Sequence, residues 1–513
     1  MARRKTSKRK VSLEKRKASL EIEQTPGRPV HNRLTPVSIL SQDEVESLHQ
    51  ASLKVLAEHG IQFSLSEART ILKTAGADVR GSDGMVRFDP DMLMDYLAKA
   101  PAAFTLHARN PIHDLRLGDS HVNFSSVSSA PHCTDTVKGR RAGNREDFEN
   151  FLRLTQAVNV AHGSAGYPVE PIDIPVPVRH LYATRAILAL TDKTFRLYNH
   201  SRQRTLDVLE MTRIAHNLSA EAFVEKPCVF ASINPNSPRE YDESMLWGMI
   251  ECARAGQVLM ISPFILAGAM APVSVAGALV QQNAEALAGI AFCQMVRAGT
   301  PVTYGGFVSN ADMKSGAPAF GTPEHVKTTL VIGQMARRYN LPYRSANANA
   351  SNTVDAQAAY ESQMCLWACL MSGATYVYHG LGWLEGGLSA SFEKFIVDAE
   401  MIQGLTEVLK PIDLSAKELA VDVIGQIPPG GHFFGSNHTI ERYEHAFYHP
   451  MLSDWRNFET WNESGALDAT QRAAGIVKTL LHQYQPPAMD QDIALALDDF
   501  VARRESQGGA PVQ

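Results

Sequence analysis

The sequence predicts an α/β fold, a (β/α)8 TIM barrel with an N-terminal helical cap and a C-terminal helical extension. From residue 121 onward, short β-prone runs alternate with amphipathic helical stretches, and eight such pairs make a barrel. A doubly wound open sheet is the rival, but no G-x-G-x-x-G turn follows an early strand. The expected strands are His121–Ser129, Val158–Tyr167, Phe195–Ser201, Cys228–Pro235, Val258–Ala267, Pro301–Asn310, Pro342–Ser351 and Thr375–Trp383.

Residues 1–35 form a basic tail that we predict to be disordered. Its first 18 residues hold nine Lys or Arg against Glu14 alone. The tail has no aromatic residue on which a base could stack, so we expect no specific nucleic-acid binding.

Residues 36–120 are predicted to be a helical region. Ser41 followed by Glu44 favours a capped helix that runs to Gly60. A second helix is expected from Ser66 to Thr74, and Pro90 is typical of the first turn of a third.

Residues 121–427 are the predicted barrel and residues 428–513 the helical extension. The boundary is the Pro428–Gly431 stretch. The barrel strands end in small or polar residues, which gather where the strands' carboxyl ends form the mouth of a barrel. The aromatic extension is placed over that mouth as a hypothesis.

Composition excludes several classes of protein. The chain has 513 residues, 44% of them hydrophobic and 20% charged, with a net charge of −5, which is typical of globular proteins. Every apolar run is shorter than the roughly 18 residues of a membrane helix, and there is no secretory leader, so we expect a cytoplasmic protein. Six scattered cysteines without a CxxC fit a reducing compartment.

The usual catalytic motifs are missing. There is no P-loop, no G-x-S-x-G and no H-E-x-x-H. His445 and His449, four residues apart, raise a metal hypothesis, but Pro450 disfavours a helix there and no metal is predicted.

Long segments resemble the corrinoid-dependent trimethylamine methyltransferase family. They are APVSVAGALVQQNAEALAGIAFCQMVRAGTPVTYGGFVSNADM, GTPEHV, SNTVDAQAAYE and HGLGWLEGGLSASFEKFIVDAE. The resemblance covers most of residues 40–480 in order. It implies a (β/α)8 barrel that passes an N-methyl group to Co(I) of a separate corrinoid protein, so that cobalamin belongs to the partner and this chain binds no cofactor.

One position separates this chain from part of that family. Members that demethylate trimethylamine carry pyrrolysine near the motif that resembles residues 351–355, and by this match Asn352 takes its place. The resemblance therefore implies the non-pyrrolysine branch, similar to glycine betaine methyltransferases. Loss of a methyl from a quaternary amine leaves a neutral tertiary amine that needs no proton, so no catalytic acid or base is assigned.

Such a reaction needs a site for a cation without N–H groups. Aromatic faces and exclusion of water recognise a quaternary ammonium, and Phe124, Tyr304 and Trp383 are candidates at strand ends. The carboxylate of a betaine calls for a cationic or N–H donor, which Arg344 and His379 on neighbouring strands could supply.

Asn347 and Asn352 complete the candidate substrate site. Strict alternation along a strand puts Arg344 and Asn347 on opposite faces unless a bulge intervenes. The alternative for Arg344 is an ion pair with Asp312 or Glu324, and for His379 a histidine of the core.

The sequence thus predicts a methyltransferase that moves a methyl group from glycine betaine or a similar quaternary amine to a corrinoid protein. Alternatives are another donor (proline betaine, carnitine, choline or trimethylamine) or a quaternary-amine-binding protein without transfer. A homo-oligomer is expected, with no membrane partner.

Overall fold

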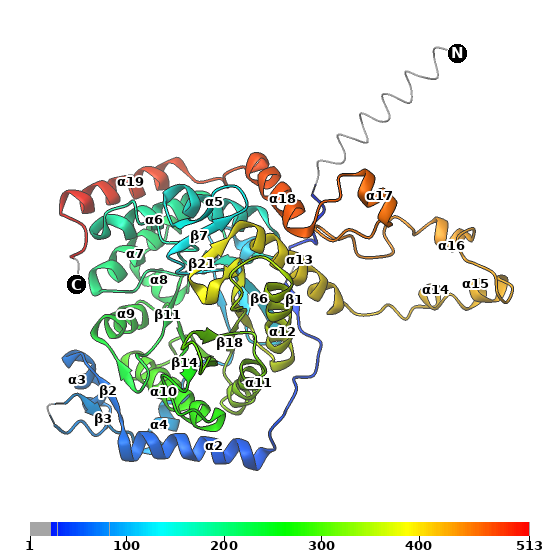
Figure 1. The fold of residues 1–513 in the computed structure, drawn as a ribbon. Coiled ribbons are helices and arrows are strands. Elements are labelled where there is room, and N and C mark those ends of the chain that lie inside the picture. The colour runs from blue at the N-terminus through cyan, green and yellow to red at the C-terminus, as the bar shows by residue number, and fades with distance from the viewer. Residues whose placement is uncertain (1–21, 28, 82, 512–513) are drawn as a thin grey trace.

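Eight parallel strands close into a barrel within the residues that the computed structural model describes, namely 22–27, 29–81 and 83–511 (Figure 1). Their order around the barrel is continuous, and a bridge between Arg196 and Phe230 joins the two ends of the sheet. The predicted fold class is confirmed. The strands are β6 (His121–Ser126), β9 (Gly163–Ser164), β10 (Thr194–Phe195), β11 (Phe230–Ile233), β13 (Val258–Ile261), β15 (Val302–Gly305), β18 (Tyr343–Ala346) and β19 (Tyr376–Leu381).

At least one helix follows each barrel strand, because parallel neighbours need a crossover connection. These helices surround the barrel (Figure 1). In chain order they are α5 (Arg145–Ala157), α6 (Val176–Leu190), α7 (Arg202–Ala215), α8 (Ala220–Glu225), α9 (Glu243–Arg254), α10 (Val275–Val296), α11 (Pro323–Arg338), α12 (Ala356–Ser372) and α13 (Phe392–Val408).

The N-terminal region packs on the outside of the barrel, largely against α10. Ser41 and Glu44 form the predicted capping box of α2 (Gln42–Lys54), and α3 (Ser66–Thr74) and α4 (Pro90–Leu97) follow as expected. The region predicted as helical over 36–120 also contains short strands, because apolar residues between the helices pair with one another and, at Gln62 and Phe63, with residues 240–241. They are β2 (Ile61–Phe63), β3 (Met85–Val86), β4 (Phe104–Leu106) and β5 (Leu115–Leu117).

The basic tail predicted as disordered over 1–35 is described only from residue 22. Residues 1–21 lie outside the described residues. Within the remainder, β1 (Val30–His31) pairs antiparallel with β6, so this part differs from the prediction. Pairing satisfies the backbone groups of Val30 and His31 at the start of the barrel strand.

The C-terminal helices cover the barrel's outer helices rather than its mouth. Helix α18 (Ala469–Gln483) packs on α13 and α5, and α19 (Gln491–Ser506) packs on α6 and α7 (Figure 1). The expectation that the extension covers the mouth is therefore wrong for these helices, whose apolar Leu480 and Phe500 are buried on the outer layer. The barrel's last helix ends at Val408, so the predicted boundary at 427 lies within a projecting segment.

Helix α10 is held against the barrel by contacts that leave no room for a larger side chain. Its Glu285 carbonyl accepts a hydrogen bond from the Tyr241 hydroxyl at 2.9 Å. A Cβ added at Gly289 would lie 2.1 Å from that hydroxyl oxygen and 2.9 Å from Ile261 Cγ2. The glycine in this helix therefore serves close packing.

We expect Gly289→Ala to lower the free energy of unfolding by about 1–3 kcal/mol, because the methyl group forces the buried Tyr241 to move. The matched control is Gly475→Ala in the exposed part of α18, where a Cβ meets nothing within 4 Å. This change should raise stability by about 0.5–1 kcal/mol. Urea unfolding of both variants tests the packing, and equal effects of the two would contradict it.

Candidate functional site

A small sheet stands beside the barrel mouth and fixes the loop that follows the last barrel strand. It consists of β20 (Trp383–Leu384), β21 (Ser389–Ser391) and the hairpin of β7 (His132–Asp135) and β8 (Gly139–Ala142). Strand β21 pairs with both β7 and β20. The sheet thereby joins the segment after β6 to the segment after β19.

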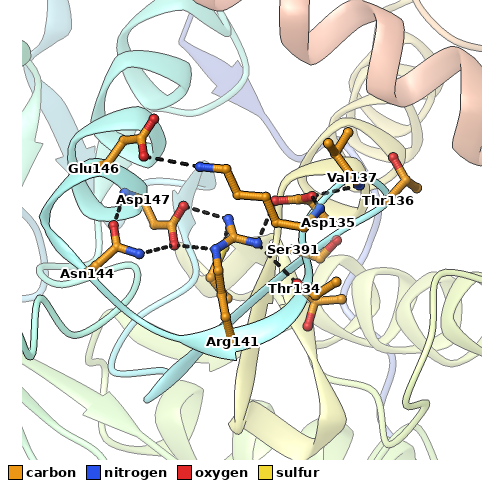
Figure 2. Close-up of polar contacts among 12 residues, drawn as sticks. Thr134, Asp135, Thr136, Val137, Arg141, Asn144, Glu146, Asp147 and Ser391 are labelled. Atoms are coloured by element: carbon orange, nitrogen blue, oxygen red, sulfur yellow. Dashed lines mark hydrogen bonds and ion pairs between the residues drawn. The ribbon is translucent and has the colours of Figure 1, made fainter.

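Arg141 anchors this hairpin (Figure 2). Its guanidinium lies between two carboxylates, with Nη1 2.7 Å from Asp135 Oδ2 and Nη2 2.6 Å from Asp147 Oδ1. Asp147 is only 1% exposed and also accepts a hydrogen bond from Asn144 at 2.8 Å. Charge-assisted contacts to a planar guanidinium fix orientation as well as distance, so the hairpin is held firmly to helix α5.

The hairpin in turn holds the loop after Trp383. Arg140 Nε donates to the Glu385 carboxylate at 2.8 Å. Glu385 and the neighbouring Gly386 and Gly387 have positive φ angles, so the chain turns sharply here. The ring of Trp383 packs directly on Gly387, where a Cβ would lie 2.5 Å from the ring.

Arg344 lies inside the barrel without a counter-charge. It is 3% exposed, and its Nη1 donates to Ser262 Oγ at 2.9 Å. Nε has no hydrogen-bond partner, and no ion pair joins the guanidinium to a carboxylate of the described residues, so neither Asp312 nor Glu324 neutralises it. Burial lowers the pKa of Arg344 to about 10, which leaves it charged at neutral pH. An unpaired buried guanidinium is costly unless an anion occupies the site.

Tyr378 connects Arg344 to a second arginine. The Arg344 guanidinium carbon lies 4.4 Å from the centre of the Tyr378 ring. The Tyr378 hydroxyl accepts a hydrogen bond from Arg196 Nη1 at 3.1 Å and donates one to the Ala165 carbonyl at 2.9 Å. The Arg196 Nε atom also lacks a partner among the described residues. Sequence reasoning missed Arg196, because nothing local distinguishes it from a surface arginine after a short strand.

A continuous cluster of rings lies next to this basic group. His379 contacts Tyr378 and Trp383, with ring centres 4.3 and 4.4 Å apart. The Trp383 ring lies 6.0 Å from Phe307 and 5.9 Å from Phe320. Phe264 extends the cluster, stacked on Phe307 at 5.4 Å. Phe320 comes from outside the strand ends, so the strand pattern gave no signal for it.

His379 has a strained backbone and a neutral ring. Its φ is +55°, and the register between β19 and β6 shifts between Val377 and Leu381. Positive φ at a non-glycine residue costs of order 1–3 kcal/mol and is found at functional sites. Its Nδ1 accepts a hydrogen bond from the Ser128 amide at 3.2 Å. Burial, assisted by the charges of Arg344 and Arg196, holds the pKa of His379 well below its ordinary value.

Arg344, His379 and Trp383 are thus brought together, whereas two predicted aromatic residues face elsewhere. Tyr304 donates to Asn283 Oδ1 on α10 at 2.8 Å, so it points out of the barrel. Phe124 pairs with Val377, the residue before the inward-facing Tyr378. Because neighbouring residues of a strand point to opposite faces, Val377 and Phe124 point outward. Both are separated from the cluster by the barrel wall.

The two predicted asparagines occupy different surroundings. Asn347 faces helix α13, where its Nδ2 lies 3.4 Å from Asp398 Oδ1, and it also donates to the Gly380 carbonyl at 3.0 Å. It therefore lies on the face opposite Arg344, as strict alternation requires. Asn352 is exposed in the loop between β18 and α12.

A buried ion pair supports the Trp383 segment from behind. Lys394 and Asp398 on α13 are fully buried and paired, and Asp398 Oδ2 accepts a hydrogen bond from the Gly382 amide at 2.8 Å. Asn349 exchanges hydrogen bonds with Trp383, through its Nδ2 at 2.7 Å and its carbonyl at 3.0 Å. These contacts fix both the backbone and the indole of Trp383.

The part of the chain that the structure describes contains no group of three or more His, Cys, Asp or Glu able to hold a metal ion. The His449 Nε2 atom lies 2.9 Å from the Glu444 carbonyl, inside the projecting segment. None of the described helices is both long and apolar enough to cross a membrane.

A (β/α)8 barrel with a buried unpaired arginine and a ring cluster near the carboxyl ends of its strands has the arrangement in which barrel proteins build their functional sites. The profile described as trimethylamine methyltransferase (MTTB) matches residues 3–509. The chain belongs to this family of methyltransferases.

Individual relatives span almost the whole chain. It is 37% identical to the glycine betaine methyltransferase of Desulfitobacterium hafniense strain Y51, over 93% of this chain and 99% of the relative. It is 28% identical to the trimethylamine methyltransferase MttB of D. hafniense strain DSM 10664 / DCB-2, over 91% and 94%. The solved structure of the monomethylamine methyltransferase MtmB of Methanosarcina barkeri aligns with a TM-score of 0.49 and 11% identity, over 97% and 92% of the two chains.

Buried histidines make the stability of this region depend on pH. His325 packs beside Phe307, is 2% exposed and donates through Nδ1 to the Val308 carbonyl at 3.1 Å. Burial lowers its pKa to about 4, so the unfolded chain binds the proton more readily. Its stabilising contribution is complete above about pH 6.5 and is lost as the pH falls toward 4.

We therefore expect the urea concentration at the midpoint of unfolding to decrease when the pH is lowered from 7 to 5. Between about pH 6 and pH 4.5, the free energy of unfolding of the wild-type protein should fall with decreasing pH more steeply than that of His325→Gln. The expected difference between the two slopes is about 1.4 kcal/mol per pH unit. Parallel pH slopes for the two proteins would show that His325 does not carry this effect.

Proposed function

We propose that this protein transfers a methyl group from the quaternary nitrogen of glycine betaine to Co(I) of a corrinoid protein. The observation that carries the proposal is the buried guanidinium of Arg344, which has a free Nε and no described carboxylate partner. A betaine carboxylate is the anion that such a group accepts. The greater identity to a glycine betaine methyltransferase than to a trimethylamine methyltransferase also supports this donor.

The ring cluster suits the other end of the same molecule. A quaternary ammonium cannot donate hydrogen bonds, so it gains most from aromatic faces within about 6 Å in a site from which water is excluded. Trp383, Phe307 and Phe264 supply such faces next to the basic group. The neutral ring of His379 adds a further face without a repelling charge, because its pKa lies well below its ordinary value.

The chemistry explains why an acid–base pair is unnecessary. The bond between nitrogen and the departing methyl carbon breaks, and its electron pair stays on nitrogen as neutral dimethylglycine. The methyl group forms a bond to the cobalt, which supplies the attacking electron pair. The residues of this chain then act by orienting the methyl group and by replacing water around the cation.

The barrel mouth is the proposed entry for the corrinoid protein. The loops that carry Trp383 and the β7–β8 hairpin stand at the carboxyl ends of the strands, where barrel enzymes place their chemistry. The free cysteines, all buried in the described chain, support a reducing cytoplasmic compartment, in which Co(I) could be maintained.

The direct test mixes the full-length protein with cob(I)alamin and glycine betaine under anaerobic conditions. We expect the spectrum of methylcobalamin to appear together with one equivalent of dimethylglycine. Choline, carnitine, proline betaine and trimethylamine are tested in parallel. Transfer from choline or trimethylamine but not from glycine betaine would overturn the donor. Tight binding of glycine betaine without transfer to cob(I)alamin or to a corrinoid protein would favour a binding protein.

Arg344→Ala should reduce kcat/KM for glycine betaine by about 30- to 1,000-fold, equivalent to about 2–4 kcal/mol for loss of a buried charge-assisted contact. Arg344→Lys should retain part of the activity, because it keeps the charge but loses the planar fork.

The matched control for this loss is Arg297→Ala, which removes an arginine paired with Glu225 on the surface. It should leave kcat/KM unchanged. If Arg344→Ala also leaves glycine betaine turnover intact, the carboxylate is bound elsewhere.

A further inference from the structure

Residues 410–450 form an arm that projects from the body of the protein (Figure 1). The structure describes every residue of this arm, and none of them is buried. The hydrophobic core includes Leu409 and Met451 on either side, so it stops where the arm begins and resumes where the arm ends. The arm has no core of its own.

The arm's regular structure is too short to be stable by itself. Its helices are α14 (Ala416–Leu419), α15 (Val421–Gln426) and α16 (Asn437–Ile440). Isolated helices of this length are far below the ~12–15 residues at which helices become marginal in water. An ion pair between Arg442 and Glu418, at 3.7 Å, links the two halves of the arm but is partly exposed. Stability must therefore come from packing against another surface.

The arm exposes an unusual amount of apolar surface. Phe434 and Phe447 are 83% and 82% exposed, and the other large apolar side chains are between 43% and 84% exposed. At roughly 150–200 Å² per side chain, the set presents on the order of 1,000 Å². A typical protein interface buries about 800 Å² per partner, so the arm exposes enough apolar surface to form one. The set comprises Ile412, Leu414, Leu419, Val421, Ile424, Phe433, Phe434, Ile440, Tyr443 and Phe447.

The chemistry of the arm favours a permanent protein partner. It holds three Lys or Arg against five Asp or Glu, so an electrostatic attraction to nucleic acid or to an anionic membrane is absent. An apolar interface of this kind is typical of obligate assemblies, whereas transient partners use more polar surfaces. A methyl acceptor, on the function proposed above, must dock and leave in each cycle, which an apolar arm would hinder.

The position of the arm also separates it from the barrel mouth. The arm starts where α13 ends, and Leu409 and Lys410 line a cavity of about 550 Å³ together with Val30 and Val160. Val30 pairs with the first residues of β6, and Val160 precedes β9, so this is the amino-terminal end of the barrel. A partner that delivers a cofactor to the mouth would approach from the opposite end.

We propose that the arm docks on a second copy of this chain, and that the two copies cover each other's arms. In a dimer with twofold symmetry, one self-complementary interface covers the apolar residues of both arms. The copy is present whenever the chain is synthesised, so the apolar residues need never remain in water.

The oligomeric state of the full-length protein tests this proposal. Light scattering coupled to size exclusion at about 10 µM should give the mass of a dimer or of a larger even assembly. Phe434→Asp/Phe447→Asp should shift the protein toward the monomer, because two charges would be buried in an apolar interface. Unchanged circular dichroism would show that the barrel remains folded.

The matched control introduces the same charges at exposed apolar positions outside the arm, Ile112→Asp/Leu495→Asp. It should keep the wild-type mass. Equal dissociation of the control and the arm variant, or a monomeric wild-type protein, would overturn the proposal, as would a corrinoid protein that requires the arm for binding.

Hydrogen exchange of the wild-type protein gives an independent readout that needs no variant. Amides of α15 and α16 should be protected at about 10 µM and lose protection on dilution. Complete exchange within seconds at the higher concentration would contradict docking. Neither measurement involves methyl transfer, so its outcome is separate from that of the donor assay.

Discussion

The site depends on one uncompensated charge inside the barrel. A guanidinium taken from water into protein costs several kcal/mol, which is normally offset by a carboxylate. Arg344 has only the Ser262 hydroxyl and the face of Tyr378, and burial has lowered its pKa without discharging it. An anion bound at Arg344 would compensate this charge, and the selectivity for glycine betaine that we propose follows from the binding of its carboxylate there.

The mouth around this charge is held rigid by contacts that do not touch it. Arg141 ties the β7–β8 hairpin to helix α5, and Arg140 ties the hairpin to Glu385. Behind the loop, the buried pair of Lys394 and Asp398 holds the Gly382 amide. A ring can lower a transition state only when its place is fixed in advance, so on the proposed function these contacts would act through Trp383. The same rigidity sustains the strained backbone of His379.

The two ends of the barrel have different tasks in this arrangement. The carboxyl ends of the strands carry the arginines and the ring cluster, whereas the arm leaves from the amino-terminal end beside Leu409. An assembly built through the arm would leave the mouth open to an exchanging partner. On these two proposals, permanent and transient contacts would lie on opposite faces of one domain.

Local patterns determined much of this protein. The alternation of β-prone and helical runs predicted the barrel strands, and Ser41 with Glu44 predicted the capping box of α2. Arg344, His379 and Trp383 could be selected as candidates because each is an unusual residue at a strand or loop position, and the structure brings them together. These features depend on neighbours in sequence, which the chain displays directly.

Only the tertiary structure decided which side chains face one another. Gly305 pairs with Arg344 and therefore faces the inside of the barrel, so the preceding residue, Tyr304, faces outward. That register is set by pairing between strands remote in sequence. Arg196 reaches Tyr378 only because the sheet closes on itself. The C-terminal helices cover the outside of the barrel and the arm has no core, and both features likewise depend on contacts between segments remote in sequence. Local periodicity determines which residues lie on each face of an element, whereas closure of the barrel and burial determine which side chains each residue contacts.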